Sequence, residues 1–320
     1  MERFKVSYNE PRPPDQHVLL PVSLGPSSMA LLDMCVEMIR AQKAIHRGRQ
    51  GFFLHVVHVM DQEDSSDTRE RLERLRERYP ECEKIEAVKL PESSKTELVQ
   101  ISRGENISDL DGAMKQVNKT GREDSKGILR KGLIEKIAER NGCQTTIYGH
   151  CQTRLAELVI AMTSKGRGSA MPHAINDGGY YPLKDVLSSE VDIYNDLQET
   201  CDLIVSRTKP PANVKLQSID DLVHQYFISV EKDFPSVVST VVRTANKLAS
   251  QEEGEDNCSI CGGIRGKDTL EWIKKITVNA PIEDAGETLC YGCMVMLRNS
   301  ADKLQWPRYS VQDIVNEYEL

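Results

Sequence analysis

Short apolar segments alternate with helical patterns through the first half of the chain, and this alternation limits the possible folds more than any other feature. The segments His17–Val22, Phe52–Val59 and Lys84–Leu90 have the length and apolar content of buried strands. Each is followed by a segment long enough for a helix. Strands joined by helices run parallel, because the chain crosses back over the sheet between them. The chain is therefore predicted to form an α/β fold, with a parallel sheet and helices on both faces.

The predicted helices follow from the spacing of apolar side chains and from the places where helices can start. One begins at Pro26, because the fixed φ of proline suits a first helical residue and its missing amide hydrogen costs nothing there. The polar stretch Gly104–Ser125 predicts a flexible insertion instead. The other predictions are helices over Thr68–Tyr79, over Gly127–Arg140, after Gly149, through most of Ser218–Ser250 and from Pro235, with a fourth strand over Thr145–Tyr148.

Changes in composition divide the chain into three predicted parts. Residues 1–215 form the α/β domain, and residues 216–257 form a helical extension that ends in the acidic linker QEEGEDN. Residues 258–320 form a four-cysteine module with a last helix over Ser310–Leu320.

Charge, hydropathy and cysteine usage exclude several classes of protein. The net charge of −8 excludes a uniformly basic nucleic-acid binder, although local basic patches remain possible. The sequence has no apolar run long enough to span a bilayer, and its first residues, MERFKVSYNE, are too polar for a signal peptide. Nine cysteines, an odd number with most of them in apolar surroundings, are typical of a reducing compartment. We therefore expect a cytoplasmic protein with no membrane partner.

Two CxxC pairs near the C-terminus predict a metal site. Cys258 and Cys261 form the first pair, and Cys290 and Cys293 form the second, twenty-eight residues further on. Each pair presents two thiolates from one turn, and two such turns complete the tetrahedron that zinc accepts. The expected ligand set contains no histidine and no carboxylate and leaves no evident open position, which favours a structural ion. An iron–sulfur cluster remains the alternative, because four cysteines suit both.

Two loops that follow predicted strands are candidates for a phosphate site. Ser23–Ser28 and Gly149–Arg154 both leave the carboxyl end of a strand and run into a helix, the place where parallel sheets bind ligands. A helix N-terminus offers free amides to an anion, and Gly25 is expected to allow close backbone approach. Taken alone, such serine and glycine turns are more often only turns and caps.

The first loop, SLGPSS, resembles the SGGxDS loop of PP-loop ATP pyrophosphatases, which adenylate substrates such as tRNA bases. The resemblance assigns the nucleotide loop to Ser23, Gly25, Ser27 and Ser28. Two departures weaken it. Leu24 replaces a glycine and is expected to put bulk where pyrophosphate would approach, and Ser27 replaces an acid that could help to organise Mg²⁺. ATP binding is therefore not expected.

The second loop resembles the GHNADD-like motif of the tRNA 2-thiolation branch of that superfamily. Gly149 and His150 remain, but Cys151, Thr153 and Arg154 replace the asparagine and both acids. The catalytic branch also uses cysteines that carry sulfur or hold an iron–sulfur cluster. The corresponding stretches here, Thr120–Lys131 and Gly179–Leu183, contain no cysteine. We therefore predict no catalytic residue in this chain.

Six blocks in order extend the resemblance over nearly the whole chain. They are similar to the second subunit of the eukaryotic cytoplasmic tRNA 2-thiolation complex. The blocks are SLGPSS, TGREDSKGILRKGL, GHCQTRLA, SKGRG, YYPLKDVLSSEVDIYNDL and FPSVVSTVVRTANKL. Members of that family usually carry further N-terminal residues with a zinc-finger-like cysteine group, so we expect either a piece of a longer protein or a short natural form.

The resemblance implies a non-catalytic subunit that forms a heterodimer with a catalytic PP-loop tRNA thiolase subunit. It also implies binding of tRNA and a requirement for 2-thiolation of wobble uridine 34 in the cytosolic tRNAs for Lys, Glu and Gln. A ubiquitin-related modifier supplies the sulfur indirectly. Two alternatives stay open. One is an ATP-dependent thiolase active on its own, with Cys151 as nucleophile, and the other is a zinc-dependent RNA-binding module.

Basic residues in two places are candidates for RNA contact. They would bind phosphates and so give affinity and position rather than sequence readout. For any single residue, an ordinary solvated face is the simpler interpretation. The candidates are Arg122, Arg130 and Lys131 in one helical stretch, and Lys165 and Arg167 in the loop SKGRG.

Overall fold

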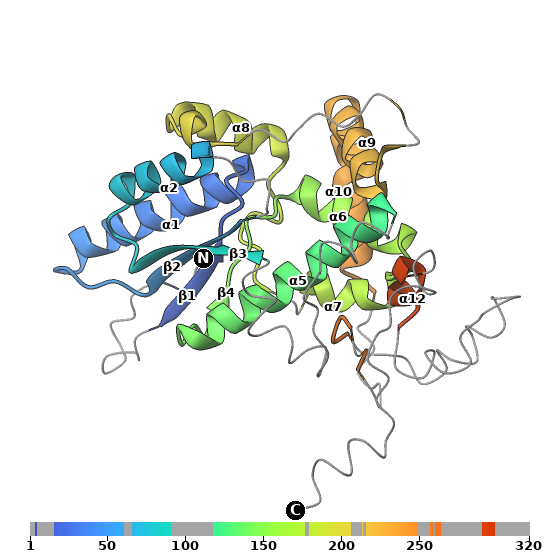
Figure 1. Ribbon diagram of the computed structural model, residues 1–320. Coiled ribbons are helices and arrows are strands. Elements are labelled where there is room, and N and C mark those ends of the chain that lie inside the picture. Colours follow the sequence, from blue (N-terminus) through green and yellow to red (C-terminus); the bar gives the residue numbers. More distant parts are fainter. Residues whose placement is uncertain are drawn as a thin grey trace, which may run out of the picture.

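A four-stranded parallel sheet forms the centre of the α/β domain in the computed structural model (Figure 1). The structure describes residues 4, 16–60, 66–90, 118–176, 179–205, 213, 216–248, 257–258, 260–263 and 290–297. The strands are β1 (His17–Pro21), β2 (Phe53–Met60), β3 (Lys84–Lys89) and β4 (Thr145–Thr146). They lie in the order β3-β2-β1-β4, and every pair is parallel, as the alternating sequence pattern predicts.

The strand order reverses between β1 and β4. The chain moves outward from β1 to β2 and β3 and then returns to place β4 on the other side of β1. The loops that leave β1 and β4 therefore flank the point at which parallel sheets bind ligands. Pro21 ends β1, where a missing amide hydrogen does not interrupt the ladder.

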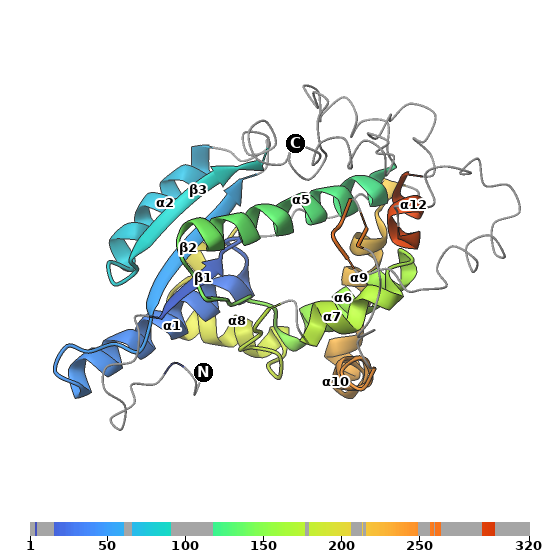
Figure 2. The same cartoon turned by 90° about the horizontal axis from the view of Figure 1, so that it is seen from below.

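Helices cover both faces of the sheet. Helices α1 (Pro26–Ile45) and α2 (Ser66–Arg78) lie on one face, and α5 (Lys119–Arg140) crosses the other (Figure 1 and Figure 2). Side chains of a strand point alternately to the two faces. Val18 and Leu20 accordingly join the core cluster with α1, whereas Leu19 joins the cluster with α5. The apolar run of β1 thus serves two cores, which explains why it lacks a polar face.

Helix α8 packs on α1, since Val191 joins the core cluster of β1 and α1, whereas α6, α7, α9 and α10 extend the domain beyond the edge formed by β4 (Figure 1). Helix α6 packs against α9 and α10 through a shared cluster that contains Leu155, Phe227 and Val238. Pro235 occupies the start of α10, which confirms the helix predicted there despite a β-branched run. The bounds are α6 Gln152–Ser164, α7 Met171–Asn176, α8 Ser188–Leu197, α9 Ile219–Asp233, α10 Pro235–Ala245 and α12 Tyr291–Leu297, with short 3₁₀ turns at Gly168–Ala170 and Cys201–Leu203.

Helix α5 joins two separate clusters of buried side chains. Its carboxyl half packs on the sheet through Leu133, Ile134 and Ile137. Its amino half packs on the cysteine module through Ile128, and Ser125 Oγ lies 3.1 Å from Met296 Sδ. Figure 2 shows the helix running from the sheet to α12. The sheet and the module are therefore connected by one continuous helix.

The flexible insertion predicted over Gly104–Ser125 is wrong at its end, because α5 already begins at Lys119. The polar sequence hides this start, but Asn118 caps it: its side chain accepts a hydrogen bond from the amide of Gly121 at 2.7 Å. Residues 104–117, the acidic linker before Asn257 and the predicted helix over Ser310–Leu320 lie outside the described residues. The domain boundaries at 215 and 257 stay predictions. Within the described residues, the structure contains no helix with the length and hydropathy needed to cross a membrane.

Candidate functional site

The loop after β1 closes on itself through its own hydroxyl groups. Ser28 Oγ donates a hydrogen bond to the carbonyl of Gly25 at 2.9 Å and lies 3.3 Å from Ser23 Oγ. The amide of Gly25 in turn donates to Ser23 Oγ at 3.3 Å. The hydroxyl groups of Ser23 and Ser28 and the amide of Gly25 therefore already have partners within the loop.

Leu24 has a left-handed backbone conformation, with φ at +58°, and its side chain is fully buried. This conformation costs a non-glycine residue about 1–2 kcal/mol. It turns the side chain into the same core cluster as Leu20 and Met29. The expectation that Leu24 places bulk where pyrophosphate would approach is therefore wrong. The leucine instead anchors the loop to the core, since burying such a side chain contributes about 1.5–3 kcal/mol to the free energy of folding.

The two candidate loops are in direct backbone contact. A Cβ atom added to Gly149 would lie 2.6 Å from Ser28 Cα and 3.0 Å from the carbonyl oxygen of Ser27. Gly25, the glycine expected to allow close approach, would meet only Ser23 Oγ, at 3.3 Å. The close approach thus depends on Gly149, and it brings the loops after β1 and β4 together at the reversal point of the sheet.

His150 lies beside two tyrosine rings at this edge of the sheet. Its ring centroid is 5.5 Å from that of Tyr181, which stacks at 5.8 Å on Tyr148. Its Nδ1 is buried and has no hydrogen-bond partner among the described residues. Burial, together with the nearby charge of Arg154, lowers the pKa of His150 to about 4. The imidazole is therefore neutral at physiological pH and adds no positive charge for a phosphate.

Cys151 is buried at the start of α6, and burial raises the pKa of its thiol. A hydrogen bond between Ser27 and the same thiol opposes part of that shift. A buried thiol with a raised pKa is poorly suited to act as a nucleophile, because the thiolate is the reactive form.

The residues that replace the two acids of the motif have local partners. Thr153 donates a hydrogen bond to Glu231, and Arg154 forms an ion pair with Glu157. Glu231 also accepts from Ser188 Oγ at 2.7 Å and from the amide of Ser189 at 2.8 Å, so it caps the start of α8. This role of Glu231 could not be predicted from the sequence. Its partner Thr153 lies 78 residues earlier, and nothing in the charged helical stretch indicates that this carboxylate points into the protein.

Packed tyrosine rings occupy the stretch Gly179–Leu183, where the resemblance would place a sulfur-handling cysteine. Tyr181, within the stretch Gly179–Leu183, donates its hydroxyl hydrogen bond to the carbonyl of Ala174 at 2.8 Å. A Cβ on Gly179 would lie 2.4 Å from the ring of Tyr148, so the backbone packs tightly there. Of the nine cysteines, the five outside the CxxC pairs lie elsewhere, at Cys35, Cys82, Cys143, Cys151 and Cys201.

The two CxxC pairs converge, as their spacing predicts. The four Sγ atoms, those of Cys258, Cys261, Cys290 and Cys293, all lie within 4.8 Å of one another. Cys261 Sγ and Cys290 Sγ are 3.7 Å apart. Four thiolates bound to one tetrahedral zinc ion at about 2.3 Å place their sulfur atoms about 3.8 Å apart. The set therefore fits a single tetrahedral ion.

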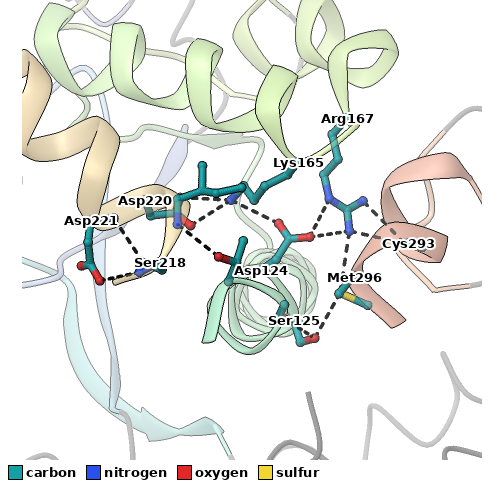
Figure 3. A network of polar contacts seen from close by, with 12 residues as sticks. Asp124, Ser125, Lys165, Arg167, Ser218, Asp220, Asp221, Cys293 and Met296 are labelled. Atoms are coloured by element: carbon teal, nitrogen blue, oxygen red, sulfur yellow. Dashed lines mark hydrogen bonds and ion pairs between the residues drawn. The ribbon is translucent and has the colours of Figure 1, made fainter. Parts of the chain in front are cut away.

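The basic residues expected to contact RNA divide into two groups. Arg122, Arg130 and Lys131 lie on α5, and Lys131 forms a loose ion pair with Glu135 at 3.7 Å. Lys165 and Arg167 have partners inside the protein: both contact Asp124, and Lys165 also contacts Asp220 (Figure 3). Arg167 is only 8% exposed. This placement differs from the open basic loop that we expected, because two carboxylates draw the side chains inward.

The fold and the paired loops define the class of protein. A parallel sheet with a serine loop and a Gly-His loop at its reversal point is a PP-loop α/β domain, here with a four-cysteine cluster that could hold a metal ion near the amino end of α5. The U34-tRNA thiolase NcsA from Methanococcus maripaludis, solved with its [4Fe-4S] cluster, has a similar fold, with a TM-score of 0.52 and 16% identity over 88% of this chain and 85% of that chain.

Similarity of sequence then gives the family. The family model for cytoplasmic tRNA 2-thiolation protein 2 matches residues 218–288. The protein of that name from Debaryomyces hansenii is 31% identical over 389 residues, which span 100% of this chain and 87% of the relative. The one from Yarrowia lipolytica is 31% identical over 386 residues, which span 100% of this chain and 91% of the relative. The chain belongs to the cytoplasmic tRNA 2-thiolation protein 2 family, and its function lies in tRNA 2-thiolation.

Proposed function

We propose that this chain is a non-catalytic subunit of a tRNA thiolase and that it works as a heterodimer with a catalytic PP-loop subunit. The observation that carries the proposal is the closure of the loop after β1. Ser23 and Ser28 use their hydroxyl groups on each other and on the loop backbone. Hydroxyl groups that are already paired gain little from a phosphate, because each new hydrogen bond replaces an existing one.

The alternative of an independent ATP-dependent thiolase requires Cys151 to act as nucleophile. Its burial and raised pKa argue against that role. The acids that could support a metal–triphosphate are replaced by Thr153 and Arg154, both of which have protein partners. These observations favour a PP-loop fold kept as a scaffold.

We propose that the four-cysteine site holds a structural zinc ion. The sulfur spacing supports one tetrahedral ion, since an iron–sulfur cluster divides the four thiolates among two or four iron atoms and holds thiolates on different irons further apart. When bound, the ion supplies folding energy rather than a reactive water, because all four positions are filled by cysteine.

We propose that the complex thiolates wobble uridine 34 in the cytosolic tRNAs for Lys, Glu and Gln, with sulfur from a ubiquitin-related modifier. The names of the relatives support thiolation of tRNA in the cytoplasm, and the structural neighbour NcsA is a thiolase of U34. Arg122, Arg130 and Lys131 on α5 are the proposed phosphate contacts. Each phosphate contact that is lost should reduce the slope of log affinity against log salt by about 1.

The decisive experiment separates the chain from its partner. The purified chain, the catalytic subunit and the pair are each incubated with tRNA, Mg-ATP and a sulfur donor, and 2-thiouridine is quantified by mass spectrometry. The pair should form the product and this chain alone should not. Calorimetric titration of the chain alone with Mg-ATP should show no heat of binding. Product formed by this chain alone, or micromolar ATP binding, would support the independent enzyme.

Two controls make the result specific. The variant Ser28→Ala should leave thiolation by the pair nearly intact, because the hydroxyl only closes the loop. Replacing Arg122, Arg130 and Lys131 by alanine should weaken tRNA binding and flatten its salt dependence. Tight tRNA binding without co-purification of a PP-loop subunit would instead favour the plain RNA-binding module.

A further inference from the structure

The loop Lys165–Gly168, here called the KGRG loop, interlocks with the second CxxC turn of the metal site, Cys290–Cys293. Gly166 has φ at +75°, and a Cβ on it would lie 2.7 Å from two ring carbons of Tyr291. A Cβ on Gly292 would lie 2.4 Å from Cγ of Arg167. Each segment therefore uses a glycine to admit a side chain of the other, and the contact is reciprocal.

Arg167 reaches the cysteines through its guanidinium group. Nη1 donates to Cys293 Sγ at 3.5 Å and to Cys290 Sγ at 3.8 Å, and Nη2 also donates to Cys293 Sγ at 3.5 Å. The adjacent edge of the group, formed by Nε and Nη2, contacts Asp124 on α5, with Nε at 2.8 Å and Nη2 at 2.7 Å from Oδ2 (Figure 3). One planar group thus bridges two metal-ligating sulfurs and a carboxylate of the α/β domain.

Charge explains why a cation is needed at this place. Four thiolates around a dication leave two negative charges in excess, and Cys258 and Cys293 are buried. A buried charge is costly unless it is paired and hydrogen-bonded. Arginine stays protonated and presents five donors in a rigid planar fork, so it can contact two sulfurs and one carboxylate at once, whereas a lysine ammonium is a point charge without that fork.

We propose that Arg167 is a positioning residue for the metal centre: its guanidinium donates hydrogen bonds to the ligands Cys290 and Cys293 and ties them through Asp124 to helix α5. The inference rests on the proposed metal site and assigns its outer partner to the α/β domain. Hydrogen bonds to ligands orient them and tune how strongly they donate to the metal. Retention of the ion therefore depends on a residue 91 positions before the nearest ligand.

The test uses the full chain loaded with cobalt(II), which replaces zinc and absorbs through its thiolate ligands. Arg167→Gln should release the ion to a chelator at least tenfold faster than the wild type, the usual scale for loss of such an outer contact. Its thiolate-to-cobalt charge-transfer band should move to lower energy, because the sulfurs lose their donors. Arg140→Gln, which removes an exposed arginine paired with Glu86, should change neither quantity.

Three further substitutions guard against misfolding of Arg167→Gln. Arg167→Lys keeps the charge without the fork and should give an intermediate release rate. Gly292→Ala should speed release in the wild type but much less in Arg167→Ala, where the Cγ atom it would strike is gone. Unchanged release and an unchanged band in both Arg167→Gln and Arg167→Lys would overturn the proposal. A wild-type chain that binds no cobalt or zinc would instead overturn the metal site itself.

Discussion

Gly149 packs directly on Ser28, at a distance that leaves no room for a side chain. A Cβ on Gly149 would lie 2.6 Å from Ser28 Cα and 3.0 Å from the Ser28 amide nitrogen. Both neighbours are backbone atoms, which cannot move aside by changing rotamer. The contact fixes the loop after β4 against the first turn of α1, and it joins the two candidate loops backbone to backbone.

Gly149→Ala should therefore destabilise the protein by about 1–3 kcal/mol, the usual range for forced overpacking. The matched control is Gly127→Ala on α5, where an added Cβ meets nothing within 4 Å. That substitution should stabilise the helix by about 0.5–1 kcal/mol. Urea unfolding of both variants measures the free energies. Equal effects in the two positions would contradict the contact.

Replacement of Leu24 should reverse the usual ranking of alanine and glycine. Leu24→Ala loses a fully buried side chain and should cost about 2–5 kcal/mol. Leu24→Gly loses the same packing but relieves the left-handed backbone at φ +58°, so it should be about 1 kcal/mol more stable than the alanine variant. Thermal unfolding of the pair decides the order. An alanine variant that is more stable than the glycine variant would show that the backbone is not strained.

Cys258→Ser should remove one equivalent of metal from the purified chain and lower its melting temperature, because the ion holds the module together. Elemental analysis gives the metal content and identifies the metal as zinc or iron. Cys201→Ser is the control, since Cys201 is exposed and lies outside the four-cysteine set. Its metal content should equal that of the wild type. Retention of a full equivalent in Cys258→Ser would exclude Cys258 as a ligand.

His150 should make the protein less stable in mild acid. Its pKa is about 4 when folded and about 6.5 when unfolded, so the unfolded chain binds the extra proton between these values. The contribution is fully present above pH 6.5 and is lost as the pH falls toward 4, at a cost of about 1–3 kcal/mol. His150→Gln should remove this part of the pH dependence. Urea unfolding at pH 7 and pH 4.5 compares the two proteins, and parallel losses of stability would contradict the shift.

Much of the fold could be predicted from sequence, because its main signals are local. The strand at Phe53–Met60 and the helix from Pro26 follow from residue type and spacing alone. The start of α5 could not be found this way, since the cap at Asn118 lies in a stretch without apolar periodicity. The four candidate metal ligands are equally local, because each CxxC pair is a short motif whose members share one turn.

The direction of single side chains could not be predicted, because it depends on partners that are distant in sequence. Arg167 looks like a surface cation in the stretch SKGRG, yet Asp124 and Cys293 turn it inward. Leu24 looks like an obstruction in its loop, yet a single backbone angle sends it into the core. Such choices are made by tertiary packing, which overrides local patterns when a buried charge or a buried apolar group is involved.

Helix α5 is held by packing contacts at two places along its length. It packs on the sheet through Leu133 and Ile137 and on the cysteine module through Ile128. Two such contacts together oppose rotation of the helix about its own axis. Arg130 and Lys131 lie between these two contacts, so the direction of their side chains depends on packing against both the sheet and the cysteine module. Loss of either contact would allow the helix to turn and would move these basic residues away from the proposed tRNA phosphates.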